Sequence, residues 1–123
     1  MAEVEVPRMR RDVMDSLAVL ADREYQERAW VRKEGFKLGQ HDDFDYHVHV
    51  LYDDTEVLRD PKAAIGSVLL PGDEADRLEA LGEVLDRLLE EHGDVDDIAY
   101  LRDPRWPEVV RLAGLALAAM VRE

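Results

Sequence analysis

The sequence predicts an all-α fold, a compact bundle of about five helices with at most one short β-hairpin. Apolar residues recur every three or four positions along several segments, and Pro, Gly or Asp residues stand where those segments begin and end. The length of the chain agrees with a single domain, because 123 residues with 46% hydrophobic side chains can form one core but hardly two. We therefore expect a single helical domain over residues 1–123.

Two helices are expected in the first third of the chain. Pro7 can occupy the first turn of a helix, where its missing N–H is not needed, and this helix should run to about Ala21. The apolar residues that share one of its faces are Met9, Val13, Leu17 and Leu20. Asp22 is a suitable N-cap for a second helix over Arg23 to Lys33. Its apolar side comprises Tyr25, Ala29 and Trp30.

Residues 42–54 fit both a strand and a helix. The strand pattern rests on a strict alternation of apolar residues, namely Phe44, Tyr46, Val48, Val50 and Tyr52. The helical stripe through the same segment consists of Phe44, Val48, Leu51, Thr55 and Leu58. A strand would need a pairing partner, and only residues 67–70 offer one. Periodicity alone leaves the choice open.

The clearest helix begins after Asp73, the expected N-cap, and ends at His92, before Gly93. Its inward face carries Leu78, Leu81, Leu85 and Leu88. Gly82 lies in the middle of this helix, where glycine costs about 1 kcal/mol relative to alanine. We interpret Gly82 as a notch that admits a neighbouring backbone.

A short turn or helix is expected over residues 94–101, and a last helix should run from Pro107 to about Arg122. The stripe of this last helix is Trp106, Val110, Ala113, Leu117 and Met120. Further apolar residues around the stripe place the helix at the centre of the bundle or give it a face for a partner. We expect it to lie antiparallel to the Asp73 helix, with the N-terminal helix packed across both.

The net charge of -13 is unevenly distributed and restricts the classes of partner. Residues 1–40 carry eight Lys/Arg and eight Asp/Glu, so the excess, eight against twenty-one, lies in residues 41–123. Such a field repels nucleic acid and anionic lipid, so neither is expected as a partner. The chain has no cysteine, no signal-like start and no apolar stretch long enough for a membrane span, which is typical of a cytoplasmic protein.

The densest set of polar side chains spans residues 41–54: His41, Asp42, Asp43, Asp45, His47, His49, Asp53 and Asp54. On a strand, His47 and His49 would point the same way and could chelate a metal ion; on a helix they would diverge. The two serines, Ser16 and Ser67, stand outside any nucleophile motif. We expect no catalytic residue, no metal and no cofactor, and hence no enzyme.

The aspartates of this segment are expected to face solvent and to contact a partner. The residues concerned are Asp42, Asp43, Asp45, Asp53 and Asp54. No Lys or Arg lies within the segment to neutralise them, and burying unpaired carboxylates costs several kcal/mol each. Trp30 and Trp106 could act as interface anchors, but their places on apolar stripes favour core packing.

The order of several short motifs resembles a family of small, acidic, functionally uncharacterised bacterial proteins that are helical and similar to immunity-type proteins. The matching motifs are, in chain order, Val48 followed by Leu51-Tyr52-Asp53-Asp54-Thr55, then Asp60-Pro61, Ile65-Gly66, Asp73-Glu74-Ala75, Leu85 with Leu88 and Leu89, and Tyr100, Pro104, Trp106 and Val110 within residues 97–110. The resemblance covers about residues 44–121. It implies that residues 53–55 close a helix end, which favours the helical interpretation of residues 42–54.

The preferred function is a non-enzymatic protein-binding domain, an immunity or regulatory protein whose acidic face neutralises a basic partner such as a toxin. One alternative is a metal-dependent enzyme or metal-binding protein that uses His47, His49 and nearby aspartates. Another is a structural accessory homodimer, which an exposed apolar face on the last helix would favour.

Overall fold

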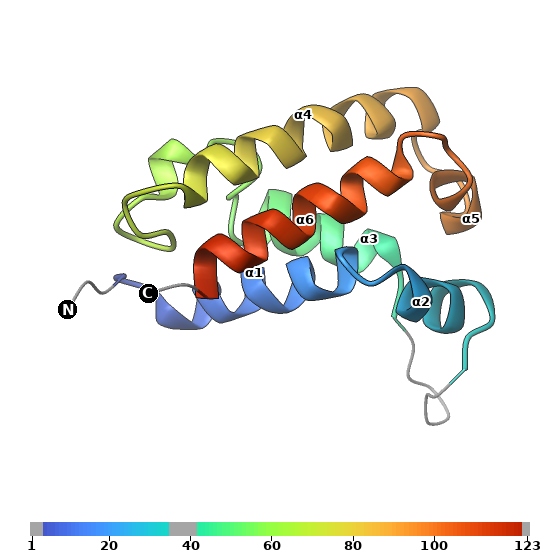
Figure 1. Ribbon diagram of the computed structural model, residues 1–123, viewed down its shortest axis with the longest axis horizontal. Helices are drawn as coiled ribbons and strands as arrows, with labels where there is room; N and C mark the ends of the chain where they lie inside the picture. Colours follow the sequence, from blue (N-terminus) through green and yellow to red (C-terminus); the bar gives the residue numbers. More distant parts are fainter. Residues whose placement is uncertain (1–3, 35–41, 122–123) are drawn as a thin grey trace.

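The computed structural model describes residues 4–34 and 42–121, and every regular element in these ranges is helical (Figure 1). The α-helices are α1 (Pro7–Leu20), α2 (Arg23–Gln26), α3 (Phe44–Val48), α4 (Glu74–His92), α5 (Asp97–Leu101) and α6 (Trp106–Val121). Two π-helical turns, η1 (Glu27–Val31) and η2 (His49–Asp54), and a 3-10 turn, η3 (Lys62–Ala64), complete the described elements. The predicted all-α fold is therefore confirmed.

Helix α6 lies between α4 and α1 and runs antiparallel to α4, as predicted (Figure 1). Its closest neighbours are α4 on one side and α1 on the other. Small side chains make this central position possible, since Ala113 and Ala116 are fully buried and let the neighbouring helices approach. The predicted leucine face of α4 is buried as well: Leu78, Leu81, Leu85 and Leu88.

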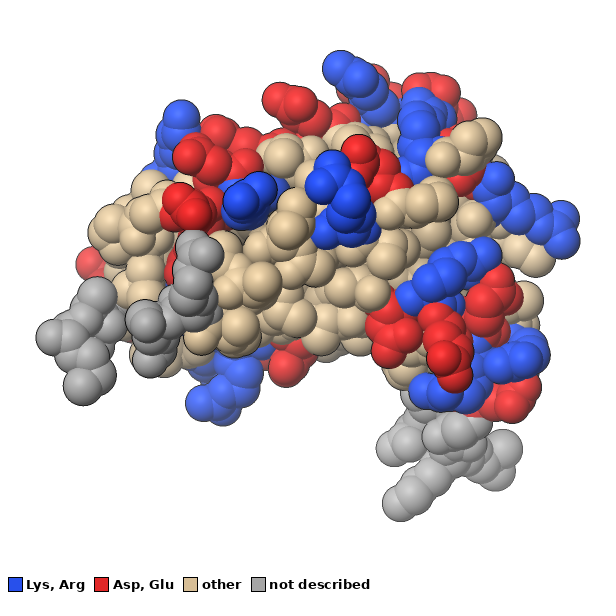
Figure 2. Space-filling model, in the orientation of Figure 1, with Lys and Arg blue, Asp and Glu red and all other residues tan. Residues whose placement is uncertain are grey.

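The outward side of α6 carries few charges. Figure 2 shows an uncharged area on this face, although Lys and Arg side chains also reach over its upper middle. The exposed ion pair between Arg111 and Glu108 lies on α6 as well. Val121 is 57% exposed, and Ala118 is exposed one turn earlier. Among the described helices, none has both the length and the apolar character that crossing a bilayer requires.

Residues 44–54 are helical, which rules out the strand interpretation and confirms the helical one. The carboxylates of Asp43 and Asp97 accept hydrogen bonds from the free N–H groups of Tyr46 (2.8 Å) and Phe44 (3.1 Å), and so cap α3. At the other end, the Thr55 hydroxyl donates to the carbonyl oxygen of Val50 at 2.7 Å. This closure matches the helix end that the family resemblance implies for residues 53–55.

The second predicted helix, residues 23–33, is two elements rather than one. Asp22 caps α2 by accepting from the backbone N–H of Tyr25 at 3.0 Å, as predicted, but the chain then widens into the π-helical turn η1. A π turn holds one extra residue, and here it lets both Ala29 and Trp30 face the core. Trp30 and Trp106 are 3% and 0% exposed, so their predicted core role is confirmed.

Gln26 joins the N-terminal helices to the start of α6. Its side chain is fully buried and accepts a hydrogen bond from Trp106 Nε1 at 2.8 Å. Its amide nitrogen donates to the carbonyl oxygens of Val19 and Leu20 at the end of α1. One buried polar side chain thus provides hydrogen-bond partners both for the end of α1 and for the Trp106 indole.

A buried ion pair closes the other end of the bundle. Arg10 on α1 makes a bidentate contact with Glu74 at the start of α4, with N–O distances of 2.7 and 2.8 Å. Arg10 also donates to the carbonyl oxygens of Val68 and Met120, and Glu74 accepts from the backbone N–H of Leu70. The two side chains are 14% and 6% exposed, so this pair ties α1, α4 and α6 together in a nearly dry environment.

Replacing Glu74 with leucine should lower the free energy of unfolding by about 3–5 kcal/mol, because it leaves the Arg10 charge buried without its partner. The double variant Arg10→Met/Glu74→Leu removes both charges and should be more stable than the single variant. Urea unfolding measures both. A Glu74→Leu protein as stable as the wild type would show that water already solvates Arg10.

Gly82 is buried against the backbone of Leu58, as the notch interpretation expects. A Cβ atom at this position would lie 3.6 Å from the Leu58 carbonyl oxygen and 3.8 Å from its Cδ2 atom, both ordinary contact distances. The approach is therefore close, but it leaves room for one methyl group.

Gly82→Ala should consequently raise the free energy of unfolding by up to about 1 kcal/mol, since it removes the backbone entropy penalty of a mid-helix glycine. Gly93→Ala is the matched control, because Gly93 ends α4 with φ of 65°. There the same change should lower stability by about 1 kcal/mol. Thermal unfolding of the two variants should therefore shift in opposite directions.

Candidate functional site

Asp42 lies at the centre of a polar cluster that we call the Asp42 cluster: Asp42, His47, Trp30, Tyr25 and Ser16. The carboxylate accepts from Trp30 Nε1 at 2.8 Å, from the Tyr25 hydroxyl at 3.2 Å and from His47 Nε2 at 2.9 Å. Its side chain is only 15% exposed. The expectation that Asp42 faces solvent is therefore wrong, because donors from α2, η1 and α3 converge on this carboxylate.

Ser16, His47 and Asp42 form a hydrogen-bonded chain of the kind found in hydrolytic enzymes. His47 Nδ1 lies 2.9 Å from the Ser16 hydroxyl oxygen, and a neutral ring with its proton on Nε2 would donate to Asp42 and accept from Ser16. Ser16 and His47 are only 2% and 5% exposed, however. A substrate cannot reach this hydroxyl unless α1 separates from α3, so the chain serves to satisfy buried polar groups.

The surroundings of Asp42 favour its ionised form. Desolvation alone would raise its pKa, but the hydrogen bonds from His47, Trp30 and Tyr25 hold the pKa below the usual 3.8. The same neighbourhood raises the pKa of Tyr25 to about 12, chiefly through burial and then through the Asp42 charge. The cluster therefore stabilises the fold as long as Asp42 stays ionised.

Asp42→Asn should lower the free energy of unfolding at neutral pH by about 1–3 kcal/mol. Because the folded-state pKa of Asp42 is depressed, its contribution is complete above the unfolded-state pKa and is lost as the pH falls through the folded-state value. The difference from wild type should thus shrink between about pH 5 and pH 2. Asp12→Asn, at an exposed position on α1, is the control and should change stability little. A deficit in Asp42→Asn that is independent of pH would contradict this assignment.

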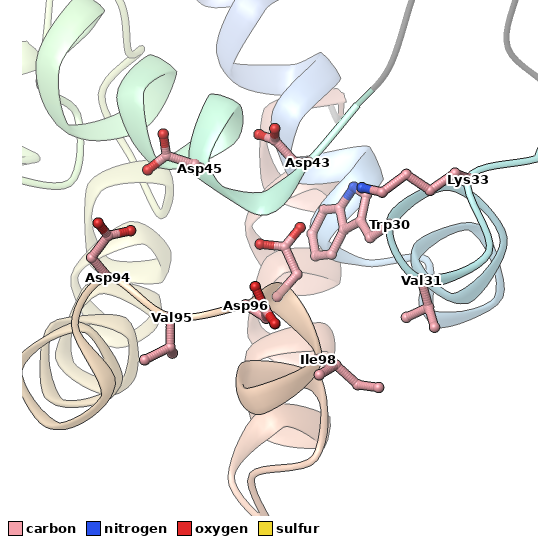
Figure 3. Close-up of a pocket in the computed structure, with 10 residues that line it drawn as sticks. Trp30, Val31, Lys33, Asp43, Asp45, Asp94, Val95, Asp96 and Ile98 are labelled. Atoms are coloured by element: carbon pink, nitrogen blue, oxygen red, sulfur yellow. The ribbon is translucent and has the colours of Figure 1, made fainter.

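Beside this cluster lies an acidic cleft of about 520 Å³ between α3, η1 and the segment that leads into α5 (Figure 3). Figure 3 shows Asp43 and Asp45 on α3 facing Asp94 and Asp96 across the opening. The aspartates that line the cleft are Asp43, Asp45, Asp94, Asp96 and Asp97. Its apolar wall consists of Trp30, Val31, Val95 and Ile98.

Two aspartates of the acidic cleft, Asp94 and Asp96, have no ion-pair partner among the described residues. Both side chains are exposed. Burial raises the pKa of Asp97, and the charges of Asp43 and Asp45 add to that rise against the opposing effects of the Phe44 N–H and Lys33. The cleft thus holds a concentrated negative potential.

Lys33 is the cation that lines the acidic cleft. Its backbone adopts φ of 57°, a left-handed conformation that is uncommon for residues other than glycine. Val95 lies on the opposite wall and is 48% exposed. The cleft therefore offers a positive group on one wall and an apolar contact on the other.

The other aspartates named from the sequence lie on the outer face of η2. Asp53 pairs with Arg59 at 2.7 Å and with His49 Nδ1 at 2.7 Å, and Asp54 is exposed. The hydrogen bond to Asp53, followed by the charge of Asp45, raises the pKa of His49. Asp45, His49 and Asp53 are four residues apart and so follow one exposed face.

The histidines do not form a metal site in the described part of the chain. His47 is buried in the Asp42 cluster, whereas His49 is exposed on the opposite face of the same helical segment. No group of three or more His, Asp and Glu side chains in the described ranges could hold a metal ion. His41, another possible ligand, lies outside the described residues.

Sequence reasoning missed the half of the acidic cleft that lies after α4. The sequence patterns assign no binding role to Asp94, Asp96 or Asp97. The available signal was Val95, an apolar residue placed between acidic ones just after a helix stop, where nothing buries it.

Comparison with known families gives one match. The family described as a domain of unknown function (DUF7945) matches residues 4–123, nearly the whole chain. No curated protein and no solved structure matches the chain. The match agrees with the uncharacterised family that the sequence motifs suggest, and the chain therefore belongs to the DUF7945 family.

Proposed function

We propose that the protein is a non-enzymatic binding protein whose acidic cleft holds a basic and partly apolar segment of a protein partner. One observation carries the proposal: five aspartates and an exposed Val95 line a single cleft to which the described residues contribute one cation, Lys33. Isolated acidic patches are common on a chain of net charge -13, but a concave acidic site with an apolar wall is suited to a specific ligand.

Charge would guide the encounter and the apolar wall would hold the complex. The excess of acidic residues beyond residue 40 attracts a basic protein from a distance, and Asp53 and Asp54 extend that field along η2. Contact then brings Lys or Arg side chains between Asp45 on one wall and Asp94 and Asp96 on the other. Burial of Val95 by an apolar neighbour of those cations would supply the non-ionic part of the affinity.

Lys33 supports this assignment, because it already places a cation where a ligand cation would go. Its positive charge opposes the rise in the pKa of Asp97, so its ammonium interacts with the cleft. A partner's lysine or arginine would compete with it or displace it.

The immunity-type resemblance gives the partner a possible identity. Immunity-type proteins neutralise toxins, and an acidic face directed at a basic toxin is consistent with the cleft described above. Asp42 is no longer part of the proposed surface, because its carboxylate is engaged within the fold. The proposed contact residues are Asp43, Asp45, Asp94, Val95, Asp96 and Asp97, with Asp53 and Asp54 at the rim.

A second candidate function is an accessory homodimer through α6. It is favoured by the uncharged part of the outward face of that helix, where Val121 and Ala118 are exposed (Figure 2). Two strongly acidic copies could approach one another more easily there than along a charged face. The metal-dependent alternative has no comparable support, since His47 and His49 point into different environments.

The triple variant Asp45→Asn/Asp94→Asn/Asp96→Asn tests the acidic cleft. Binding of a short peptide that contains two lysines and a leucine should weaken about tenfold, as expected for the loss of three partly exposed charges. Wild-type binding should also weaken with added salt, and the variant should depend on salt less. Titration followed by NMR, with the Trp30 indole signal as the local probe, measures both effects.

The control triple variant, Asp12→Asn/Asp15→Asn/Glu83→Gln, makes the same change in charge at exposed positions outside the cleft. It should retain nearly full binding, and both triple variants should unfold at about the wild-type temperature. If both triple variants bound the peptide equally weakly, the loss would reflect net charge alone, and a specific site would be refuted. A partner captured from the source cells should show the same ranking, and its toxicity with and without this protein tests the immunity role.

A further inference from the structure

The acidic cleft adjoins a smaller hollow, which we call the Phe44 hollow and which has a volume of about 380 Å³. The two openings share a boundary, because Asp45, Asp94, Val95 and Asp97 line both of them. Figure 3 shows three of these residues, Asp45, Asp94 and Val95, on the same side of the acidic cleft. A ligand bound in the acidic cleft therefore has the Phe44 hollow directly beside it.

The wall of the Phe44 hollow that is not shared with the cleft is apolar and comes from three helices. Phe44 on α3 and Tyr100 on α5 are buried, and their ring centres lie 4.6 Å apart. Val48 on α3 and Leu89 on α4 also line the hollow, and both are half-buried. The Tyr100 hydroxyl already donates to the carbonyl oxygen of Gly93. This wall therefore presents an apolar surface that is still partly open to water.

Charge restricts the kind of group that can occupy the hollow. The charged side chains that line it, among the described residues, are all carboxylates: Asp45, Asp94 and Asp97. Asp45 contacts His49 at 3.4 Å and Asp97 caps α3, whereas Asp94 has no ion-pair partner in the described ranges. These carboxylates repel an anion. An apolar group that stands next to a positive charge matches both the apolar wall and the acidic boundary.

We propose that the Phe44 hollow receives an apolar side chain, the size of leucine or phenylalanine, that stands next to a lysine or arginine in the partner's segment. This inference rests on the proposed function, because the cation holds the segment in the acidic cleft and brings its neighbour to the hollow. The apolar side chain would cover Val48, Leu89 and the exposed side of Val95. The cleft would thus attract basic segments in general, and the hollow would select among them.

The size of the hollow suits one side chain better than a separate ligand. A volume of about 380 Å³ lies near the lower limit for pockets that enclose whole small molecules, roughly 300 Å³. Its half-buried wall would remove from water about half of a leucine side chain. Burial on that scale corresponds to about tenfold in affinity.

Two peptides that differ in one residue test the Phe44 hollow. Both have blocked ends, and their sequences are Gly-Lys-Leu-Lys-Gly and Gly-Lys-Ser-Lys-Gly. In NMR titrations, the wild-type protein should bind the leucine peptide about tenfold more tightly than the serine peptide. The leucine methyl groups should also show nuclear Overhauser effects to the methyl groups of Val48 and Leu89.

Val48→Phe fills the hollow and should reduce the affinity for the leucine peptide about tenfold, to that of the serine peptide. The serine peptide should bind this variant as it binds the wild type, because Val48 does not line the acidic cleft. Val110→Phe is the matched control, since Val110 is also half-buried but lines neither opening. It should leave both affinities unchanged. Circular dichroism checks that the variants fold, and the two peptides with wild-type protein decide the question if Val48→Phe does not.

The inference and the proposed function fail in different ways. If both peptides bind wild-type protein equally tightly and in a salt-dependent manner, the acidic cleft stands and the Phe44 hollow is refuted. The same holds if the leucine methyl groups show no contact with Val48 or Leu89, or if Val48→Phe and Val110→Phe lose equal affinity. If neither peptide binds, the proposed function is refuted and this inference with it. Saturable binding of phenethylamine in that case would assign the two openings to a small amine instead.

Discussion

The hydrogen bond between Gln26 and Trp106 is the contact on which the position of the acidic cleft depends. It fixes the indole at the start of α6 against the end of α1, and the ring then supports Phe44 at 5.3 Å and Trp30 at 6.2 Å between ring centres. Trp30 lines the acidic cleft, and Trp106 lines another hollow between α2 and the start of α6. Aromatic packing therefore fixes the wall of the acidic cleft against the start of α6.

The long helices of the fold could be predicted from sequence, and the reasons are local. Pro7, Asp73 and Gly93 mark helix ends through their own backbone chemistry, and the leucines of α4 repeat with the helical period. The Asp42 cluster could not be predicted in this way. Counting charges along residues 42–54 found no cation for Asp42, whereas two of its donors, Trp30 and Tyr25, come from an earlier helical segment. Hydrogen-bond donors that are distant in the sequence cannot be identified from the pattern of residues around the acceptor.

The acidic cleft could be predicted only in part, because its two halves come from segments that are distant in the sequence. Asp43 and Asp45 were predicted as contact residues, but Asp94 and Asp96 come from a segment roughly fifty residues later. Packing of α3 against α5 brings the two acidic segments together. Asp97 connects them directly, because its carboxylate caps α3. A carboxylate that serves as a cap is fixed in place, so part of the negative charge in the cleft is positioned by the requirements of folding rather than by binding.

The π-helical turn η2 has a consequence for how the chain tolerates changes in length. A π turn accommodates one residue more than an α-helical turn, so it is in effect a single-residue insertion kept inside a helix. Deletion of one residue between positions 49 and 54 would restore an ordinary helix locally. The helical segments before and after η2 would keep nearly their present directions, and Phe44 and Thr55 their places, because an α-helical turn covers about the same rotation with one residue fewer. Relatives that differ by one residue here should therefore carry a compensating change in η2 itself rather than in a loop.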